Sequence, residues 1–220
     1  MNAPLLPGLK TFVCRETTEA FVPFISLFLS QRTTTINLGF ARLPPDPPTL
    51  VLASVIDSFP TICPDLRQIS LNALPRDPAV TTAVSEMLLA CNRNTLRKFD
   101  VDSPLTEAAR EVLYRPPNLS ELRSVLEGTT SLPSVVLPNL VKMYIVYPHG
   151  HEWLHNFHGA AYDKLTSVTF HTASPQVGDF LEAFECFALA TSIPITLSTF
   201  RSTPNAHGTR IIPLCLRLSI

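Results

Sequence analysis

A short pattern of apolar and polar positions recurs along the chain. It consists of an apolar residue, two variable residues, a second apolar residue, one variable residue and usually a third apolar residue. Clear copies occupy Leu9–Cys14, Leu66–Leu71, Leu96–Val101, Leu140–Ile145 and Leu165–Phe170. Weaker copies occupy Thr33–Leu38, Leu119–Ser124 and Leu197–Ser202, the last two with serine in the final apolar position. Because alternate side chains of an extended chain point to the same side, each copy predicts a short strand with one apolar side.

The segments between these copies carry apolar residues at helical spacing instead. They are Thr17–Gln31, Pro48–Phe59, Pro78–Asn92, Leu105–Tyr114 and Pro175–Ala190. One strand and one helix cannot bury their apolar sides alone, whereas stacked strand–helix units can. The chain therefore predicts an α/β solenoid with a parallel sheet on the concave side and helices on the convex side. A doubly wound α/β domain, the alternative, would have longer apolar strands that do not share a pattern.

The copies PDLRQISL (64–71) and PNLVKMYI (138–145), separated by helical spacers of irregular length, resemble the leucine-rich-repeat region of fungal F-box-type proteins. The resemblance covers nearly the whole chain, from Leu9 onward. It implies one leucine-rich-repeat solenoid over residues 1–220, with about eight irregular repeats. It also implies a protein–protein interaction module, similar to the substrate-recognition part of a ubiquitin-ligase adaptor.

The ends of the chain set the limits of this resemblance. An F-box would precede the repeats, but the first repeat begins at Leu9, so contact with a Skp1-type adaptor is expected only if an F-box lies outside this chain. Neither end carries an obvious polar cap, which a free solenoid needs. Three interpretations are open: a fragment of a longer protein, a truncated gene model, or a protein that binds a partner at its ends. A non-functional gene fragment is a further interpretation.

The variable positions of the strands predict a polar sheet face on the concave side. Alternation places residues such as Ser70 and Glu121 there, in a surface of mixed charge. Arginine and tyrosine are the residue types that most often dominate protein interfaces. The candidate protein-binding residues that we select on this face are Gln68, Asn72, Lys98, Asp100, Arg123, Lys142, Tyr144 and His171.

Composition narrows the remaining classes of function. The chain is 45% apolar and 16% charged, which favours a folded core over disorder. Its net charge of −1 gives no reason to expect nucleic-acid or membrane binding. Five scattered cysteines without a C-x-x-C pair, and an N-terminus without a signal-peptide pattern, favour an intracellular location, cytoplasmic or nuclear. No glycine-rich phosphate loop is present in the sequence, and we expect no cofactor.

One motif gives a competing prediction. His151–His155 reads HEWLH, an H-E-x-x-H motif in which two histidines one helical turn apart bind zinc and the glutamate activates a zinc-bound water. A zinc-dependent hydrolase would use His151, Glu152 and His155, with a third ligand such as Glu182 or Glu185.

The position of this motif argues against that hydrolase. HEWLH lies in the spacer between two copies of the strand pattern, and its histidines flank an apolar arc that contains Trp153 and Leu154. We therefore expect a histidine ridge exposed on an outer helix, with no catalysis and no dedicated metal site. Whether the ridge from His149 to His158 binds metal weakly is left open.

Overall fold

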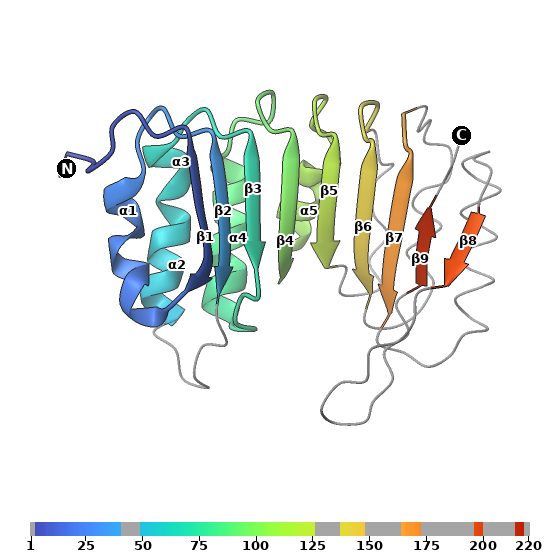
Figure 1. Cartoon of the computed structure of the whole chain (residues 1–220), viewed down its shortest axis with the longest axis horizontal. Helices are drawn as coiled ribbons and strands as arrows, with labels where there is room; N and C mark the ends of the chain where they lie inside the picture. The colour runs from blue at the N-terminus through green and yellow to red at the C-terminus, as the bar shows by residue number, and fades with distance from the viewer. Residues whose placement is uncertain are drawn as a thin grey trace.

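A computed structural model describes residues 3–40, 49–125, 137–147, 164–172, 196–199 and 214–217 of the chain. Its described strands form one sheet in the order β1-β2-β3-β4-β5-β6-β7-β9-β8 (Figure 1). They are β1 (Thr11–Thr17), β2 (Thr35–Phe40), β3 (Gln68–Asn72), β4 (Lys98–Pro104), β5 (Glu121–Val125), β6 (Lys142–Tyr147), β7 (Ser167–Thr172), β8 (Thr196–Thr199) and β9 (Leu214–Arg217). The strands from β1 to β7 are parallel and follow the order of the chain.

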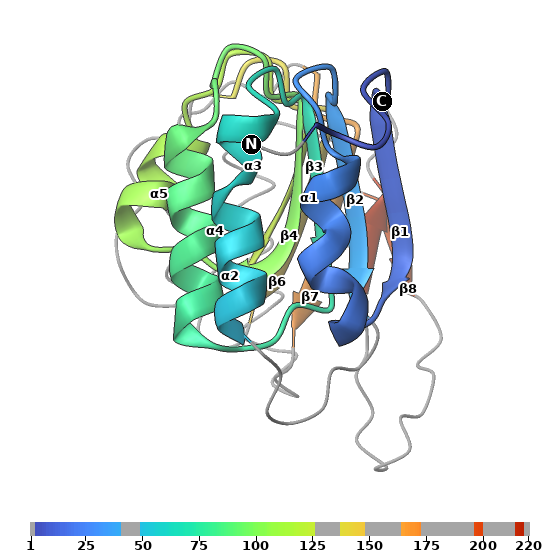
Figure 2. The same ribbon diagram turned by 90° about the vertical axis from the view of Figure 1, so that its left-hand side faces the viewer.

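The described helices all lie on one face of this sheet, as Figures 1 and 2 show. They are the 3-10 helix η1 (Glu19–Phe24) and the α-helices α1 (Ile25–Phe28), α2 (Thr49–Asp57), α3 (Phe59–Ile62), α4 (Pro78–Ala90) and α5 (Glu107–Leu113). The prediction of an α/β chain with a parallel sheet backed by helices is confirmed at this level. None of the helices in the described ranges is both long and apolar enough to cross a membrane.

Strand pairing aligns the repeated pattern position by position. The middle apolar position forms one row across the sheet: Phe12, Ile36, Ile69, Phe99, Leu122, Met143 and Val168. From Phe12 to Met143 no side chain of this row is more than 9% exposed. Each of the six copies that form β1 to β6 therefore contributes one residue to the same strip of core, on the side that the helices cover.

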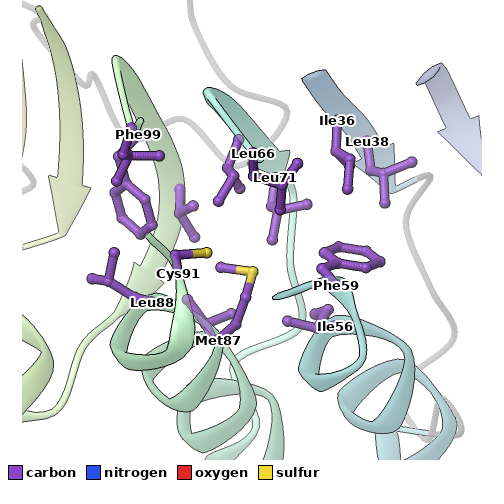
Figure 3. Packing of buried hydrophobic residues seen from close by; sticks show 14 of the residues in the cluster. Ile36, Leu38, Ile56, Phe59, Leu66, Leu71, Met87, Leu88, Cys91 and Phe99 are labelled. Carbon is purple, nitrogen blue, oxygen red and sulfur yellow. The ribbon is translucent and has the colours of Figure 1, made fainter. Parts of the chain in front are cut away.

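Helices α2, α3 and α4 close the core from the other side. Figure 3 shows their side chains directed at the apolar rows of the sheet, from Ile56, Phe59, Met87 and Leu88, with Cys91 just after α4. The sheet residues that they face are Ile36, Leu38, Leu66, Leu71 and Phe99. All of these side chains are buried, so the core follows the spacing of apolar residues in both patterns.

The weaker copy at Thr33–Leu38 forms a regular strand because its polar residue is satisfied. Thr33 occupies the first apolar position and is fully buried. Its hydroxyl donates to the carbonyl of Leu9 at 2.9 Å and accepts the amide of Ser30 at 3.1 Å. A buried hydroxyl with both roles filled costs little, so a threonine can take the place of the usual leucine.

Gly39 in β2 is required by a close approach of the backbone. Strand pairing between β1 and β2 shifts register between Cys14 and Thr17. A Cβ atom at Gly39 would lie 2.6 Å from the carbonyl oxygen of Arg15. The oxygen belongs to the backbone and a Cβ is fixed to its own Cα, so neither atom could move aside cheaply, and glycine permits the two strands to stay paired here.

The helix that the sequence predicts over Thr17–Gln31 is wrong in detail. The segment instead forms a 3-10 turn followed by the four-residue α1, because Pro23 lacks the amide hydrogen that an α-helix interior uses.

The copy at Leu197–Ser202 does not form the next parallel strand of the array. β8 lies at the sheet edge, and β9 pairs antiparallel with both β7 and β8. Alternation within a strand carries no information on the direction of its neighbour, so the pattern could not reveal this pairing. The predicted helix over Pro175–Ala190 lies outside the described residues.

Candidate functional site

The face of the sheet opposite the described helices carries the variable positions of the pattern, and we call it the polar face. Its first row runs through Gln68, Lys98, Glu121, Lys142 and Ser167, in register from β3 to β7. Its second row runs through Ser70, Asp100, Arg123 and Tyr144. The in-register pairing of parallel strands brings these side chains next to one another, although 21 to 30 residues separate neighbours in the sequence.

The first row contains a chain of charges of alternating sign. The carboxylate of Glu121 accepts from Nζ of Lys142 at 3.0 Å and lies 3.1 Å from Nζ of Lys98. Partial burial by itself would raise the pKa of Glu121. Hydrogen bonds from Lys142 and Lys98, together with their charges, outweigh this burial and lower the pKa below its usual value. Glu121 therefore stays ionised and fixes the positions of both ammonium groups.

Arg123 is the centre of the second row. Its Nη1 atom donates to Oδ1 of Asn72 at 2.9 Å and to Oδ1 of Asp100 at 3.4 Å. The contact with Asn72 passes over β4, because Asn72 lies on β3 and Arg123 on β5. Its guanidinium also stacks on the ring of Tyr144, 4.6 Å from the ring centre. Stacking and hydrogen bonds together hold the guanidinium in one orientation.

Asp100 is held on its other side by a hydroxyl. Ser70 donates to Oδ2 of Asp100 at 2.9 Å, and Asn72 donates through Nδ2 to the Ser70 hydroxyl at 3.2 Å. These bonds close a network of Ser70, Asn72, Asp100 and Arg123 across three strands. Such a connected network is preorganised, so its charges need little rearrangement when a partner binds.

Asp102, two residues after Asp100 on β4, has a structural role. Its carboxylate accepts the backbone amides of Ala73 at 2.5 Å and Leu74 at 3.2 Å. Ala73 has a φ of 58°, in the left-handed region that residues other than glycine rarely adopt. Two charge-assisted hydrogen bonds stabilise this turn after β3.

A cavity of about 220 Å³ lies on the polar face over β4 to β7. Its charged and polar lining consists of Lys98, Asp100, Glu121, Arg123, Lys142, Tyr144 and Ser167. Phe99, Leu122 and Met143, whose side chains are buried on the helix-covered side of the sheet, complete the lining between them. The cavity is therefore bounded by charged and polar side chains that project from neighbouring strands.

The eight selected residues differ in how they relate to the cavity. Five of them line the cavity: Lys98, Asp100, Arg123, Lys142 and Tyr144. Asn72 contacts the cavity through its hydrogen bond to Arg123, and Gln68 is exposed in the first row without lining it. His171 pairs with Val146 in β7, and its side chain lies outside the described part of the structure.

Glu121 is the important residue that the selection omits. The alternation places it on the polar face, but alternation alone does not distinguish it from the other outward residues. Its importance follows from its two lysine neighbours, which come from β4 and β6. The parallel pairing of the strands brings these residues together. Aligning the copies of the strand pattern and looking for an acidic residue between two lysines would therefore have identified Glu121.

The residues of the competing zinc prediction, His151, Glu152 and His155, lie outside the described residues, as do Glu182 and Glu185. Within the described ranges, no group of three or more histidine, cysteine, aspartate or glutamate residues is placed to hold a metal ion. The zinc prediction therefore stays a prediction.

The buried cysteines belong to the core. Burial raises the pKa of the Cys63 thiol to about 11, against hydrogen bonds with Thr33 and Ser30 that lower it. Burial and the nearby Cys63 raise the pKa of the Cys91 thiol to about 12. A thiol with such a pKa is almost entirely protonated at neutral pH and is a poor nucleophile.

Comparison with known proteins adds no family to this picture. No family model matches the chain, and a search of curated proteins finds no significant match. The site must therefore be interpreted from its own geometry.

Proposed function

We propose that this chain is a leucine-rich-repeat interaction module that binds a protein partner on its polar face. Seven parallel strands in chain order, of which β1 to β6 each contribute one residue to the same buried row, support a solenoid built of stacked units. Binding on the sheet face of such an array, across several units, is the usual way in which solenoids recognise partners.

The observation that carries the proposal is the Arg123–Tyr144 pair in the cavity. The two residue types are enriched at the energetic centres of interfaces, and here they stack at 4.6 Å in the lining of the cavity. Asn72 and Asp100 fix the arginine before any partner arrives, so the partner does not have to order it.

The similarity of the repeats to fungal F-box-type proteins extends this proposal. In that setting the partner is a substrate protein, and ubiquitin transfer is the task of separate subunits. An intracellular location, cytoplasmic or nuclear, is part of the same proposal. The free thiols of Cys14, Cys63 and Cys91 are consistent with a reducing compartment.

Affinity capture with matched variants tests the interaction. The full chain serves as bait, and captured proteins are quantified by mass spectrometry. Lys142→Glu reverses a charge at a side chain that is 61% exposed, so folding should be unaffected, and Tyr144→Ala removes the stacking partner of Arg123. Arg93→Glu is the control, because Arg93 is exposed in the turn after α4, away from the cavity.

A partner bound through the polar face should be captured by the wild type and by the control, and lost with both cavity variants. Loss of an interface centre corresponds to roughly 2 kcal/mol or more, about a thirtyfold change in affinity. If both cavity variants still capture every protein that the wild type captures, the polar face is not the binding surface and the proposal is wrong.

A further inference from the structure

The cavity on the polar face has an excess of positive charge. Three cationic side chains line it, Lys98, Arg123 and Lys142, against two carboxylates, Asp100 and Glu121. Four ion pairs join these three cations to the two carboxylates. The side chains that line the cavity therefore carry one positive charge in excess.

The hydrogen-bond donors of the cavity are also incompletely used. Nη1 of Arg123 donates to Asn72 and Asp100, but within the described part of the chain its Nη2 atom has no acceptor. Lys142 donates one hydrogen bond, to Glu121, and most of its side chain is exposed. Tyr144 covers a face of the guanidinium, and Nε of Arg123 is buried without a hydrogen-bond partner, so Nη2 is the arginine donor that remains for a ligand. A carboxylate accepts strongly from a guanidinium N–H.

Size sets a limit on the ligand. Pockets for cofactors and drug-sized molecules measure about 300–1,000 Å³, whereas this cavity measures about 220 Å³. It has room for a side chain with its flanking backbone, which is how one protein inserts into the surface of another.

We propose that this cavity binds the carboxylate of one aspartate or glutamate side chain from the protein partner, between Nη2 of Arg123 and the ammonium group of Lys142. This inference rests on the proposed interaction function. A single carboxylate balances the one excess positive charge. A phosphate dianion would exceed it and would be repelled by Glu121 and Asp100, which lie within the same cavity.

A titration with small probes tests the ligand chemistry without the partner. The probes are the α-amides of N-acetylglutamate, N-acetylglutamine and N-acetylphosphoserine, added at millimolar concentration to the isotope-labelled full chain. The side-chain Nε–H signal of Arg123 is followed by two-dimensional NMR and assigned by its loss in Arg123→Lys. The glutamate probe should shift this signal saturably, and the uncharged glutamine probe should not.

Charge reversal in Lys142→Glu should weaken binding of the glutamate probe by about tenfold, because it exchanges attraction for repulsion near the bound carboxylate. The control Arg93→Glu should leave it unchanged, and added salt should weaken binding to the wild type. Absence of a saturable shift with the glutamate probe, or equal shifts with the glutamine probe, overturns the proposal. Tighter binding of the phosphoserine probe also overturns it.

The two proposals fail in distinguishable ways. If affinity capture depends on the polar face but the glutamate probe does not bind, the interaction function stands and the carboxylate assignment is wrong. If the glutamate probe binds but both cavity variants capture the same proteins as the wild type, the carboxylate site stands and the protein-binding function is wrong.

Discussion

Truncation of Phe99 tests the central feature of the fold, the buried row that crosses the sheet. Phe99 is fully buried in β4, in register with Ile69 on one side and Leu122 on the other. From the helix side it faces Leu88 and Cys91 in Figure 3. Phe99→Ala removes the whole ring from this setting and leaves a cavity bounded by two strands and α4.

The expected cost is about 3–5 kcal/mol, the range for truncating a buried aromatic residue to alanine. Total stabilities of native domains are about 5–15 kcal/mol, so Phe99→Ala should lose a large part of the free energy of unfolding. Phe99→Leu retains most of the volume and should lose about 1.5 kcal/mol or less. Equilibrium unfolding in urea, followed by circular dichroism, measures both changes.

Val13→Ala is the matched control. Val13 lies on β1 between the inward residues Phe12 and Cys14 and is 49% exposed. Its truncation should change the free energy of unfolding by no more than about 0.5 kcal/mol. A loss below about 1.5 kcal/mol for Phe99→Ala, or an equal loss for Val13→Ala, would refute the assignment of the two faces.

Three further predictions concern single residues. Because the pKa of Glu121 is lowered in the folded state, its stabilising contribution is present above its unfolded value of about 4.5 and is lost as the pH falls through the lower folded value. Glu121→Gln should therefore flatten the dependence of stability on pH below about 4.5, and urea unfolding at several pH values that gives parallel profiles would contradict this. Asp77 caps α4 by accepting the amide of Ala79 at 2.8 Å, so Asp77→Ala should cost about 1 kcal/mol in urea unfolding while Asp77→Asn, which keeps an acceptor, should cost little. Equal costs for the two variants would mean that the cap is unimportant. Iodoacetamide at pH 8, with peptide mapping, should label Cys63 and Cys91 only when the chain is unfolded, since both are buried with pKa values of about 11 and 12; labelling of the native chain at the unfolded rate would show that these thiols are accessible.

Much of the strand assignment was predictable because alternation is a local property. Even the weaker copies at Thr33–Leu38 and Leu119–Ser124 coincide with β2 and β5. Inward and outward positions followed from the same alternation, which is why Phe99 is buried and Lys98 lies on the polar face. These features depend on the geometry of one extended chain and need no knowledge of its neighbours.

Helices were less predictable than strands. The segment at Pro78–Asn92 carries an N-cap aspartate and a proline at the first position, and α4 begins at Pro78 as those signals indicate. The segment at Thr17–Gln31 has apolar residues at helical spacing as well, but Pro23 limits it to short turns. The spacing of apolar residues does not show that one backbone N–H, at the proline, is missing.

The sequence by itself determined where strands form and which of their side chains are buried, because period-two alternation is written into each copy of the pattern. Only the tertiary structure decided which outward residues meet. Arg123 reaches Asn72, 51 residues earlier, and Glu121 lies between two lysines of neighbouring strands. It also decided that β9 inserts antiparallel beside β7. Contacts of this kind depend on how strands stack in register and on side-chain rotamers, neither of which a pattern along one chain contains.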